Sequence, residues 1–114
     1  MSAHTCLVLL EGDPLRALDL ELLTKAALGQ DIRILHATSA AEAFALADLE
    51  HARLVLWDRV LAREGDIAAA RSAQLQIVWI SDDPAPAEEA AWLQRPIRLA
   101  DLLALRAFLE PPPP

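Results

Sequence analysis

The chain has 114 residues, a length that suits one domain with one hydrophobic core. Its hydrophobic content of 54% excludes a disordered chain. Its formal charge of −7 argues against a nucleic-acid surface, because phosphate binding needs clustered basic residues and the arginines are scattered along this chain. The lone cysteine, Cys6, excludes an internal disulfide and fits a reducing compartment. No segment approaches the ~18 to 20 apolar residues of a membrane span and the start MSAHT lacks the basic region of a signal peptide, so we expect a cytoplasmic protein.

The chain begins with a strand and a long helix. The apolar run at 6–10 predicts a strand that is buried on both faces. Asp13 is a suitable N-cap for the helix that follows, and Pro14 suits its first turn because the missing N–H would be unpaired there. Gly29 is a suitable C-cap. Leucines recur at helical spacing between the two caps and predict the buried side of the helix: Leu15, Leu18, Leu22 and Leu23.

A second strand and a second helix follow. Residues 32–37 alternate between apolar and polar, which is typical of a strand nearer the edge of a sheet. Ser39 and Glu42 have the spacing of a capping box and start a helix that ends near Glu50. The apolar side of this helix is formed by Phe44, Leu46 and Leu49.

Two further strands lead directly into polar side chains. The buried run at 54–57 continues into Asp58, and the run at 75–80 continues into Ser81. Residues 66–73 between them favour a short helix. Both strands therefore end on residues that can take part in chemistry.

The last part of the chain predicts a short fifth strand at 91–94, followed by Arg95, and a final amphipathic helix at 99–109. The buried side of that helix is expected to be Leu102, Leu103, Leu105 and Phe108. Four prolines cannot continue a helix and favour an extended stretch. We therefore expect a domain at 1–110 and the start of a proline-rich linker at 111–114.

Strands and helices alternate throughout, with short connections. This pattern predicts an α/β fold of three layers, a doubly wound parallel sheet of five strands with helices on both faces. Functional sites in such sheets lie at the carboxyl ends of the strands. That edge would gather Glu11, Gly12, Asp13, Asp58, Ser81 and Arg95.

Several carboxylates at the ends of buried strands need a compensating cation, metal or hydrogen-bond network, since an unpaired buried charge costs several kcal/mol. Four segments in this order, LVLLEGDP, LVLWD, IVWIS and LQRPI, resemble the signature segments of response-regulator receiver domains of the CheY type. The resemblance covers residues 5–110, nearly the whole chain. It implies a flavodoxin-like sheet with the strand order 2-1-3-4-5, and a regulator of two-component signalling that is not an enzyme.

The resemblance also implies roles for individual residues. Asp58 matches the aspartate that accepts a phosphoryl group, and Ser81 matches the hydroxyl that contacts the phosphate. Arg95 stands where the family has a lysine. Trp92, three residues earlier, matches the aromatic side chain whose rotamer reports phosphorylation.

The family holds Mg²⁺ with two acidic residues after the first strand and with the phosphoacceptor. Carried over to this chain, the metal ligands would be Glu11 and Asp58, but the second acidic position is Gly12, which has no side chain. Asp13 is the alternative ligand, although as the N-cap of a helix its carboxylate should face backbone N–H groups. Mg²⁺ demands near-octahedral oxygen ligation, so Gly12 weakens the case for this cofactor.

Two further departures concern Arg95 and the fourth crossover. The planar guanidinium of Arg95 could form a bidentate pair with Asp58 and occupy the place of a phosphate. Only 13 residues separate Ser81 from Arg95, too few for both a helix and a strand. We therefore expect the fourth helix of the family to be reduced or missing.

The leading hypothesis is an atypical, degenerate receiver (a pseudo-receiver) that acts mainly through protein–protein contacts. Its partner would be a histidine kinase, an output domain or a second copy of itself in a homodimer, and it would bind neither nucleic acid nor membrane. The first alternative is a working phosphorelay receiver that is phosphorylated on Asp58 with Mg²⁺. The second alternative, from another class, is a flavodoxin-like domain that binds a small ligand.

Overall fold

The computed structural model describes residues 6–87 and 91–109 of the chain, and the expected linker, Pro111–Pro114, lies outside them. The described residues form five strands, five α-helices and one 3-10 helix, which are, in chain order, β1 (Cys6–Leu10), α1 (Pro14–Leu28), β2 (Arg33–Ala37), α2 (Ala40–Glu50), β3 (Leu54–Asp58), η1 (Arg59–Leu61), α3 (Glu64–Ser72), β4 (Gln76–Ser81), β5 (Trp92–Gln94), α4 (Leu99–Leu103) and α5 (Arg106–Leu109). No helix in this part of the chain is long and apolar enough to span a membrane.

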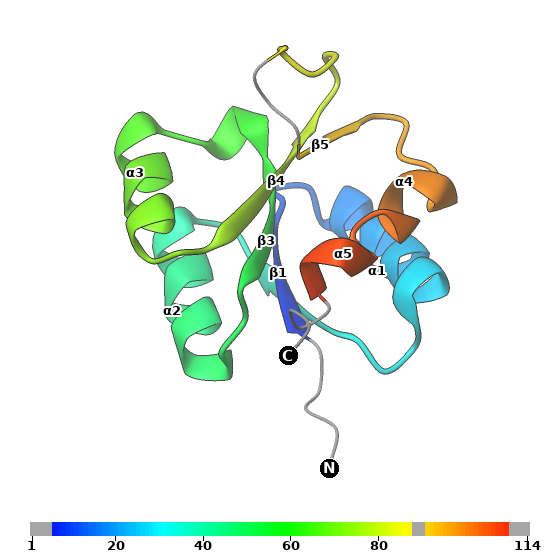
Figure 1. Cartoon of the computed structure of the whole chain (residues 1–114), viewed down its shortest axis with the longest axis horizontal. Coiled ribbons are helices and arrows are strands. Elements are labelled where there is room, and N and C mark those ends of the chain that lie inside the picture. The colour runs from blue at the N-terminus through cyan, green and yellow to red at the C-terminus, as the bar shows by residue number, and fades with distance from the viewer. Residues whose placement is uncertain (1–5, 88–90, 110–114) are drawn as a thin grey trace.

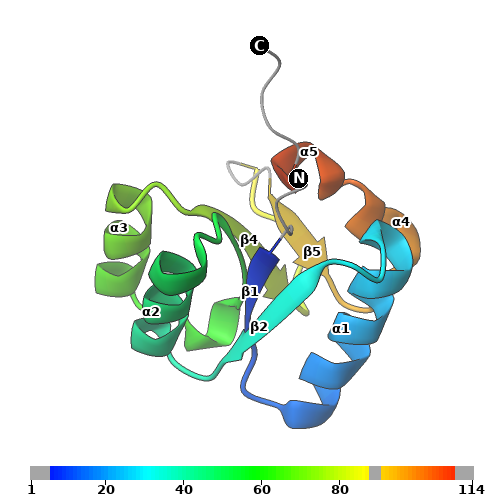
Figure 2. The same ribbon diagram turned by 90° about the horizontal axis from the view of Figure 1, so that it is seen from below.

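The strands form one sheet in the order β2-β1-β3-β4-β5, and every neighbouring pair is parallel. Helices α2 and α3 cover one face of the sheet, and α1, α4 and α5 cover the other (Figure 1; the same division is seen from below in Figure 2). The expected three-layer, doubly wound fold and its strand order are therefore confirmed.

The central strands supply a core on both faces because successive side chains of a strand point to opposite sides. On β1, Leu7 and Leu9 join the core under α1, whereas Val8 and Leu10 join the core under α2 and α3. Strand β3 is buried along its whole length. This double burial explains the continuous apolar runs in the sequence. The parallel direction of the strands places their carboxyl ends at one edge of the sheet.

Helix α1 begins and ends as expected, with Asp13 as N-cap and Gly29 as C-cap. The expectation for its buried side is wrong for three of the four leucines, and only Leu23 among them packs against the core. Leu15, Leu18 and Leu22 are exposed. The buried residues are instead Ala17, Leu20, Thr24 and Ala27. Apolar residues occur all around the helix, interspersed with polar ones, so leucine spacing alone could not tell which side faces the sheet.

Helix α2 shows the same preference for small buried side chains. Its fully buried residues are Ala43 and Ala47. Of the expected apolar side, Phe44 and Leu46 are partly buried and pack against the core, whereas Leu49 is 72% exposed. Alanine lets a helix axis lie close to the sheet, where a longer side chain would hold it away. The expected capping box is confirmed in half: the Ser39 hydroxyl accepts from the backbone of Glu42 at 3.2 Å, but the Glu42 carboxylate accepts from the residue before Ser39.

The final helix, expected to be continuous, consists of α4 and α5 joined by a tight turn. Within the turn, the Leu105 backbone donates to the Leu102 carbonyl at 3.0 Å, a bond of three-residue spacing. Such spacing places side chains three residues apart on one side, and Leu102 and Leu105 are both buried. Leu103 and Phe108, expected on the buried side, are exposed.

The connection between β4 and β5 forms no helix in its described residues, 82–87 and 91, which agrees with a reduced or missing fourth helix. Large side chains cover this end of the sheet instead. Trp79 and Trp92 are neighbours in the β4–β5 register, and the Arg59 guanidinium lies 4.9 Å from the centre of the Trp79 ring. Two tryptophans and an arginine thus replace part of the cover that a helix would give.

Candidate functional site

The expected cluster lies at the carboxyl edge of the sheet. Glu11 follows β1, Asp58 ends β3, Ser81 ends β4 and Arg95 follows β5. Glu11, Asp58 and Ser81 are buried. The parallel order of the strands brings these residues together although up to 84 positions separate them in the chain.

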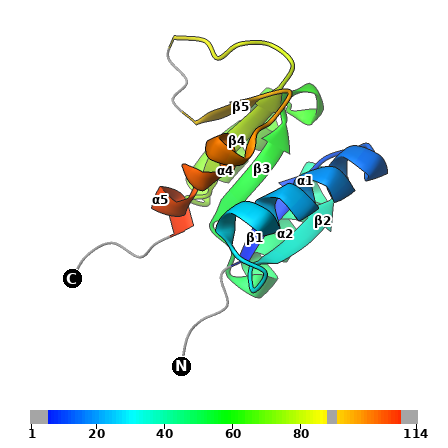
Figure 3. The same ribbon diagram turned by 90° about the vertical axis from the view of Figure 1, so that its right-hand side faces the viewer.

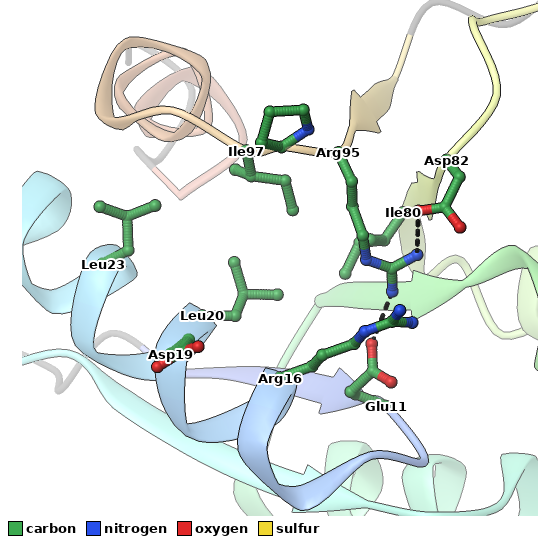
Figure 4. A pocket seen from close by; sticks show the side chains of 10 residues that line it. Glu11, Arg16, Asp19, Leu20, Leu23, Ile80, Asp82, Arg95 and Ile97 are labelled. Atoms are coloured by element: carbon green, nitrogen blue, oxygen red, sulfur yellow. Dashed lines mark hydrogen bonds and ion pairs between the residues drawn. The ribbon is translucent and has the colours of Figure 1, made fainter.

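Arg95 is the centre of the cluster. Its Nη2 atom lies 2.8 Å from Glu11 Oε2 and 3.1 Å from Asp58 Oδ2, and its Nη1 atom lies 3.4 Å from Asp82 Oδ1. Figure 4 shows Arg95 between Glu11 and Asp82. The expected bidentate pair with Asp58 is wrong, because one nitrogen is shared by two carboxylates and the other is turned to Asp82.

The remaining oxygens of the two buried carboxylates accept backbone hydrogen bonds. Asp58 Oδ1 accepts from the Val60 N–H at 3.1 Å, and Glu11 Oε1 accepts from the Asp13 N–H at 3.1 Å. Each carboxylate therefore has one oxygen on Arg95 and the other on the backbone. One guanidinium and two backbone N–H groups thus satisfy the hydrogen bonding of the two buried carboxylates and offset part of their negative charge within the chain.

The charge of Arg95 is secured by this environment. Partial burial disfavours the guanidinium, but the hydrogen bond and charge of Asp58, together with those of Glu11, outweigh it and raise the pKa of Arg95 above its ordinary value. Arg95 is consequently a permanent cation in the site.

The residues present do not fit a Mg²⁺ ion. Gly12 offers no ligand, and Asp13 Oδ1 accepts from the N–H groups of Leu15 at 2.9 Å and Arg16 at 3.4 Å, as expected for an N-cap. The described part of the chain holds no group of three or more His, Cys, Asp or Glu side chains gathered to bind a metal. The Arg95 nitrogen lies between the two buried carboxylates, the position that a divalent cation would need.

Ser81 and Trp92 are both tied to one loop residue. The Ser81 hydroxyl accepts from the Asp83 N–H at 3.1 Å, and the Trp92 indole N–H donates to the Asp83 carbonyl at 2.9 Å. Trp92 is partly buried and packs against the core under α2 and α3. In this structure the hydroxyl and the aromatic side chain therefore anchor the start of the β4–β5 connection.

Sequence reasoning missed the roles of Asp82 and Arg59. Asp82 accepts from Arg95, and Arg59 stacks on Trp79 beside Asp58. Asp82 directly follows Ser81 and Arg59 directly follows Asp58, so their positions in the sequence already indicated that both lie near the predicted site. What the sequence lacked was the direction of each side chain.

A cavity of about 460 Å³ adjoins the cluster, between α1 and the segment that leads into α4 (Figure 4). Its walls are mainly apolar and include Leu20, Leu23, Ile80 and Ile97. Charged side chains stand at one end, among them Arg16 and Arg95. The cavity is therefore a groove in the helical layer that opens next to the candidate site.

No model of a known protein family matches the chain, and no curated protein matches it in sequence. Its structure is similar to several solved ones. PhyR from Brucella abortus, described as a response regulator, superposes with a TM-score of 0.65 at 24% identity over 92% of this chain and 47% of PhyR. PhyR from Bartonella quintana, described as an anti-anti-sigma factor, gives 0.67 at 18% identity over 95% and 49%.

The chemotaxis protein CheY4 from Vibrio cholerae gives a TM-score of 0.72 at 15% identity over 95% of this chain and 100% of CheY4. The chain thus spans about half the length of the two PhyR proteins and the whole of CheY4. Together with the parallel sheet and the strand-end cluster, these similarities show that the chain has the fold of a response-regulator receiver domain.

Proposed function

We propose that this chain is an atypical receiver module of two-component signalling that acts by binding other proteins, with its phosphoacceptor site held closed by its own arginine. The observation that carries the proposal is the position of Arg95 Nη2, within 3.1 Å of both Glu11 and Asp58. The module is a regulator and not an enzyme. It keeps the scaffold of a receiver, but the guanidinium of Arg95 takes the place that an exchangeable metal ion would have in the site.

The closed site opposes phosphorylation for two physical reasons. Phosphoryl transfer relies on positioning and on a metal that neutralises developing charge, and the oxygens that would hold the metal accept from Arg95. Freeing Asp58 would break a largely buried ion pair, which costs about 3 kcal/mol or more. In addition, the exposed Asp82 adds negative charge beside the place of an incoming phosphate.

A protein partner is the natural target of such a module. PhyR, which shares the fold, is described both as a response regulator and as an anti-anti-sigma factor. For this chain we propose a histidine kinase, an output domain or a second copy as the partner. We propose that the chain meets this partner in the cytoplasm, because a single free cysteine is compatible with a reducing compartment.

The test is incubation with acetyl phosphate, or with beryllofluoride, in the presence of Mg²⁺. We expect no increase in mass from an added phosphoryl group and no change in tryptophan fluorescence, although Trp57 and Trp79 lie next to the site in the sheet. A phosphorylated product that disappears in Asp58→Asn would contradict the proposal and favour a working phosphorelay receiver.

A double variant, Gly12→Asp with Arg95→Lys, is the matched positive control. A Cβ atom on Gly12 would lie 3.8 Å from the Leu61 side chain, which is ordinary contact distance, so an acidic residue fits there. The lysine removes the guanidinium whose Nη2 atom bridges the two buried carboxylates. We expect this variant to gain a Mg²⁺-dependent fluorescence response that the wild-type chain lacks.

A further inference from the structure

Exposed apolar side chains are concentrated on one layer of the molecule. Among the described residues, six of the eight large hydrophobic side chains that remain exposed lie on α1 and on α4–α5. We call this set the outer apolar face; it consists of Leu15, Leu18, Leu22, Leu99, Leu103 and Phe108. A helix that is apolar on both its inner and its outer side is expected to be covered on both.

The geometry of α1 makes its part of this face a continuous ridge. Leu15, Leu18 and Leu22 are three and four residues apart, so they follow one line along the helix, opposite the buried Ala17 and Leu20. Helix α1 contacts α4, and the two helices lie side by side on the same face of the sheet (Figure 3). The apolar groove beside Arg95 lies between α1 and residues 95–97, which lead into α4, so the ridge and the groove belong to the same helical layer.

The charges of this layer point to a second copy as the occupant. Helix α1 and residues 98–109 carry four basic and three acidic residues, whereas the rest of the chain carries six basic and fourteen acidic residues. Two copies of a protein with a charge of −7 repel each other over most of their surfaces. They meet with the least repulsion through the layer that is both nearly neutral and apolar.

The dimensions predict a weak dimer. Helix α1 has 15 residues. At 1.5 Å per residue it is about 22 Å long, and a face two helices wide covers on the order of 400 to 500 Å² in plan. Stable dimers bury about 800 Å² per partner, so this interface belongs to the small class.

We propose that two copies of the chain associate through the outer apolar face, with the leucine ridge of each copy packed against the groove and the α4–α5 helices of the other. A two-fold arrangement pairs the same patch with itself and closes the assembly at two copies. The inference rests on the proposed function as an interaction module, and it names the partner and the surface.

The experiment is sedimentation velocity of the full chain from about 1 to 500 μM, a range that brackets a small interface. We expect a reversible monomer–dimer equilibrium in the micromolar range. Leu18→Glu and Leu22→Glu place a charge in the contact and should each weaken the dimer at least ~10-fold. Leu49→Glu is the matched control, because it makes the same change at an exposed leucine of α2, on the opposite face of the sheet, and should leave the equilibrium unchanged.

Circular dichroism melts of the three variants verify that they are folded, and the exposure of the substituted leucines predicts melting curves like that of the wild type. A wild-type chain that is monomeric throughout overturns the inference, as does a dimer that Leu49→Glu weakens as much as Leu18→Glu does.

The same runs, repeated with beryllofluoride and Mg²⁺, separate this inference from the proposed function. A chain that is monomeric and insensitive to beryllofluoride leaves the closed-site module standing and removes only the dimer. A dimer that forms only with beryllofluoride and Mg²⁺ supports the surface and overturns the closed site.

Discussion

At the scale of single residues, the behaviour of the site depends on which cation lies between Glu11 and Asp58. A lysine would place a compact ammonium there, whereas the guanidinium of Arg95 reaches Asp82 with one nitrogen and both buried carboxylates with the other. Glu11 contributes to this arrangement, because its extra methylene relative to aspartate extends the carboxylate toward Arg95. The proposed closed site therefore depends on the side chains of Glu11 and Arg95 together, which form an ion-pair network with Asp58 and Asp82.

Replacing Arg95 with methionine should destabilise the fold by about 3 kcal/mol, because two buried carboxylates lose their counter-charge. Mg²⁺ should restore part of this loss in the double variant Gly12→Asp with Arg95→Met, which supplies the missing ligand, and have no effect on the wild-type chain. Urea unfolding with and without Mg²⁺ measures both effects. Arg16→Met, at an exposed arginine near the same groove, is the control and should cost less than ~1 kcal/mol. Equal stability of Arg95→Met and the wild type would contradict the role assigned to the network.

Cys6 gives a pH-dependent prediction. Burial raises the pKa of its thiol, Arg33 offsets part of this increase, and Glu50 adds to it. Since the thiolate is the reactive form, a thiol reagent at pH 8 should react more slowly with the folded chain than with the chain in urea. The stability due to this shift is present below the ordinary thiol pKa of about 8.5 and is lost as the pH rises through the raised value.

Cys6→Ala should remove that part of the decrease in unfolding free energy at alkaline pH. Reaction rates that are equal in the folded and unfolded chains would show that the thiol is not protected.

At the scale of elements, helix α1 links the candidate site to the proposed dimer surface. Its N-terminus holds Asp13 in the capping position, its inner side packs on the sheet, and its outer side carries the leucine ridge. Helix α1 therefore adjoins the cluster at the strand ends with its N-terminus and contributes to the outer apolar face with its outer side.

The capping role of Asp13 can be separated from a metal-binding role. Asp13→Ala should cost about 1 kcal/mol through loss of the cap, while Asp13→Asn should be nearly neutral because asparagine caps about as well. Thermal unfolding of the two variants gives the comparison. If Asp13→Asn proved as destabilising as Asp13→Ala, or if it alone changed the response to Mg²⁺, the carboxylate would have a role beyond capping.

The connection between β4 and β5 shows how elements compensate for one another. With no helix in its described residues, this connection leaves one end of the sheet to be covered by Trp79, Trp92 and Arg59. The indole N–H of Trp92 also holds the backbone of Asp83. Large aromatic side chains can perform this task because each buries an area that several aliphatic residues would otherwise supply.

At the scale of the whole molecule, the described fold ends where its core ends. Leu109, the last residue of α5, still packs against the core under α1. We therefore propose that the domain reaches residue 110 and that 111–114 begin a linker. Deleting residues 111–114 should leave the thermal unfolding midpoint unchanged within ~1 to 2 °C, since the deletion leaves the whole of the proposed domain in place. A larger decrease would place the tail within the folded domain.

The sequence predicted the architecture well because its signals are local. Continuous apolar runs marked strands that are buried on two faces, and the caps at Asp13, Gly29 and Ser39 marked the helix ends. Each of these signals depends only on residues that are close together in the chain, so it can be recognised in the sequence without knowledge of the tertiary structure.

The sequence did not predict which sides of the helices are buried or how the site is paired. On α1 and α2 most of the fully buried side chains are alanines, whereas several of the leucines that the sequence placed on the buried side are exposed. The short distance from helix to sheet selects small side chains at the positions of closest approach, and the sequence does not display that distance. The sequence by itself determined the order of strands and helices and the residues that meet at the carboxyl edge. Only the tertiary structure decided that Arg95 joins Glu11, Asp58 and Asp82, because side-chain direction and the reach of one methylene depend on where four separate strand ends lie in space.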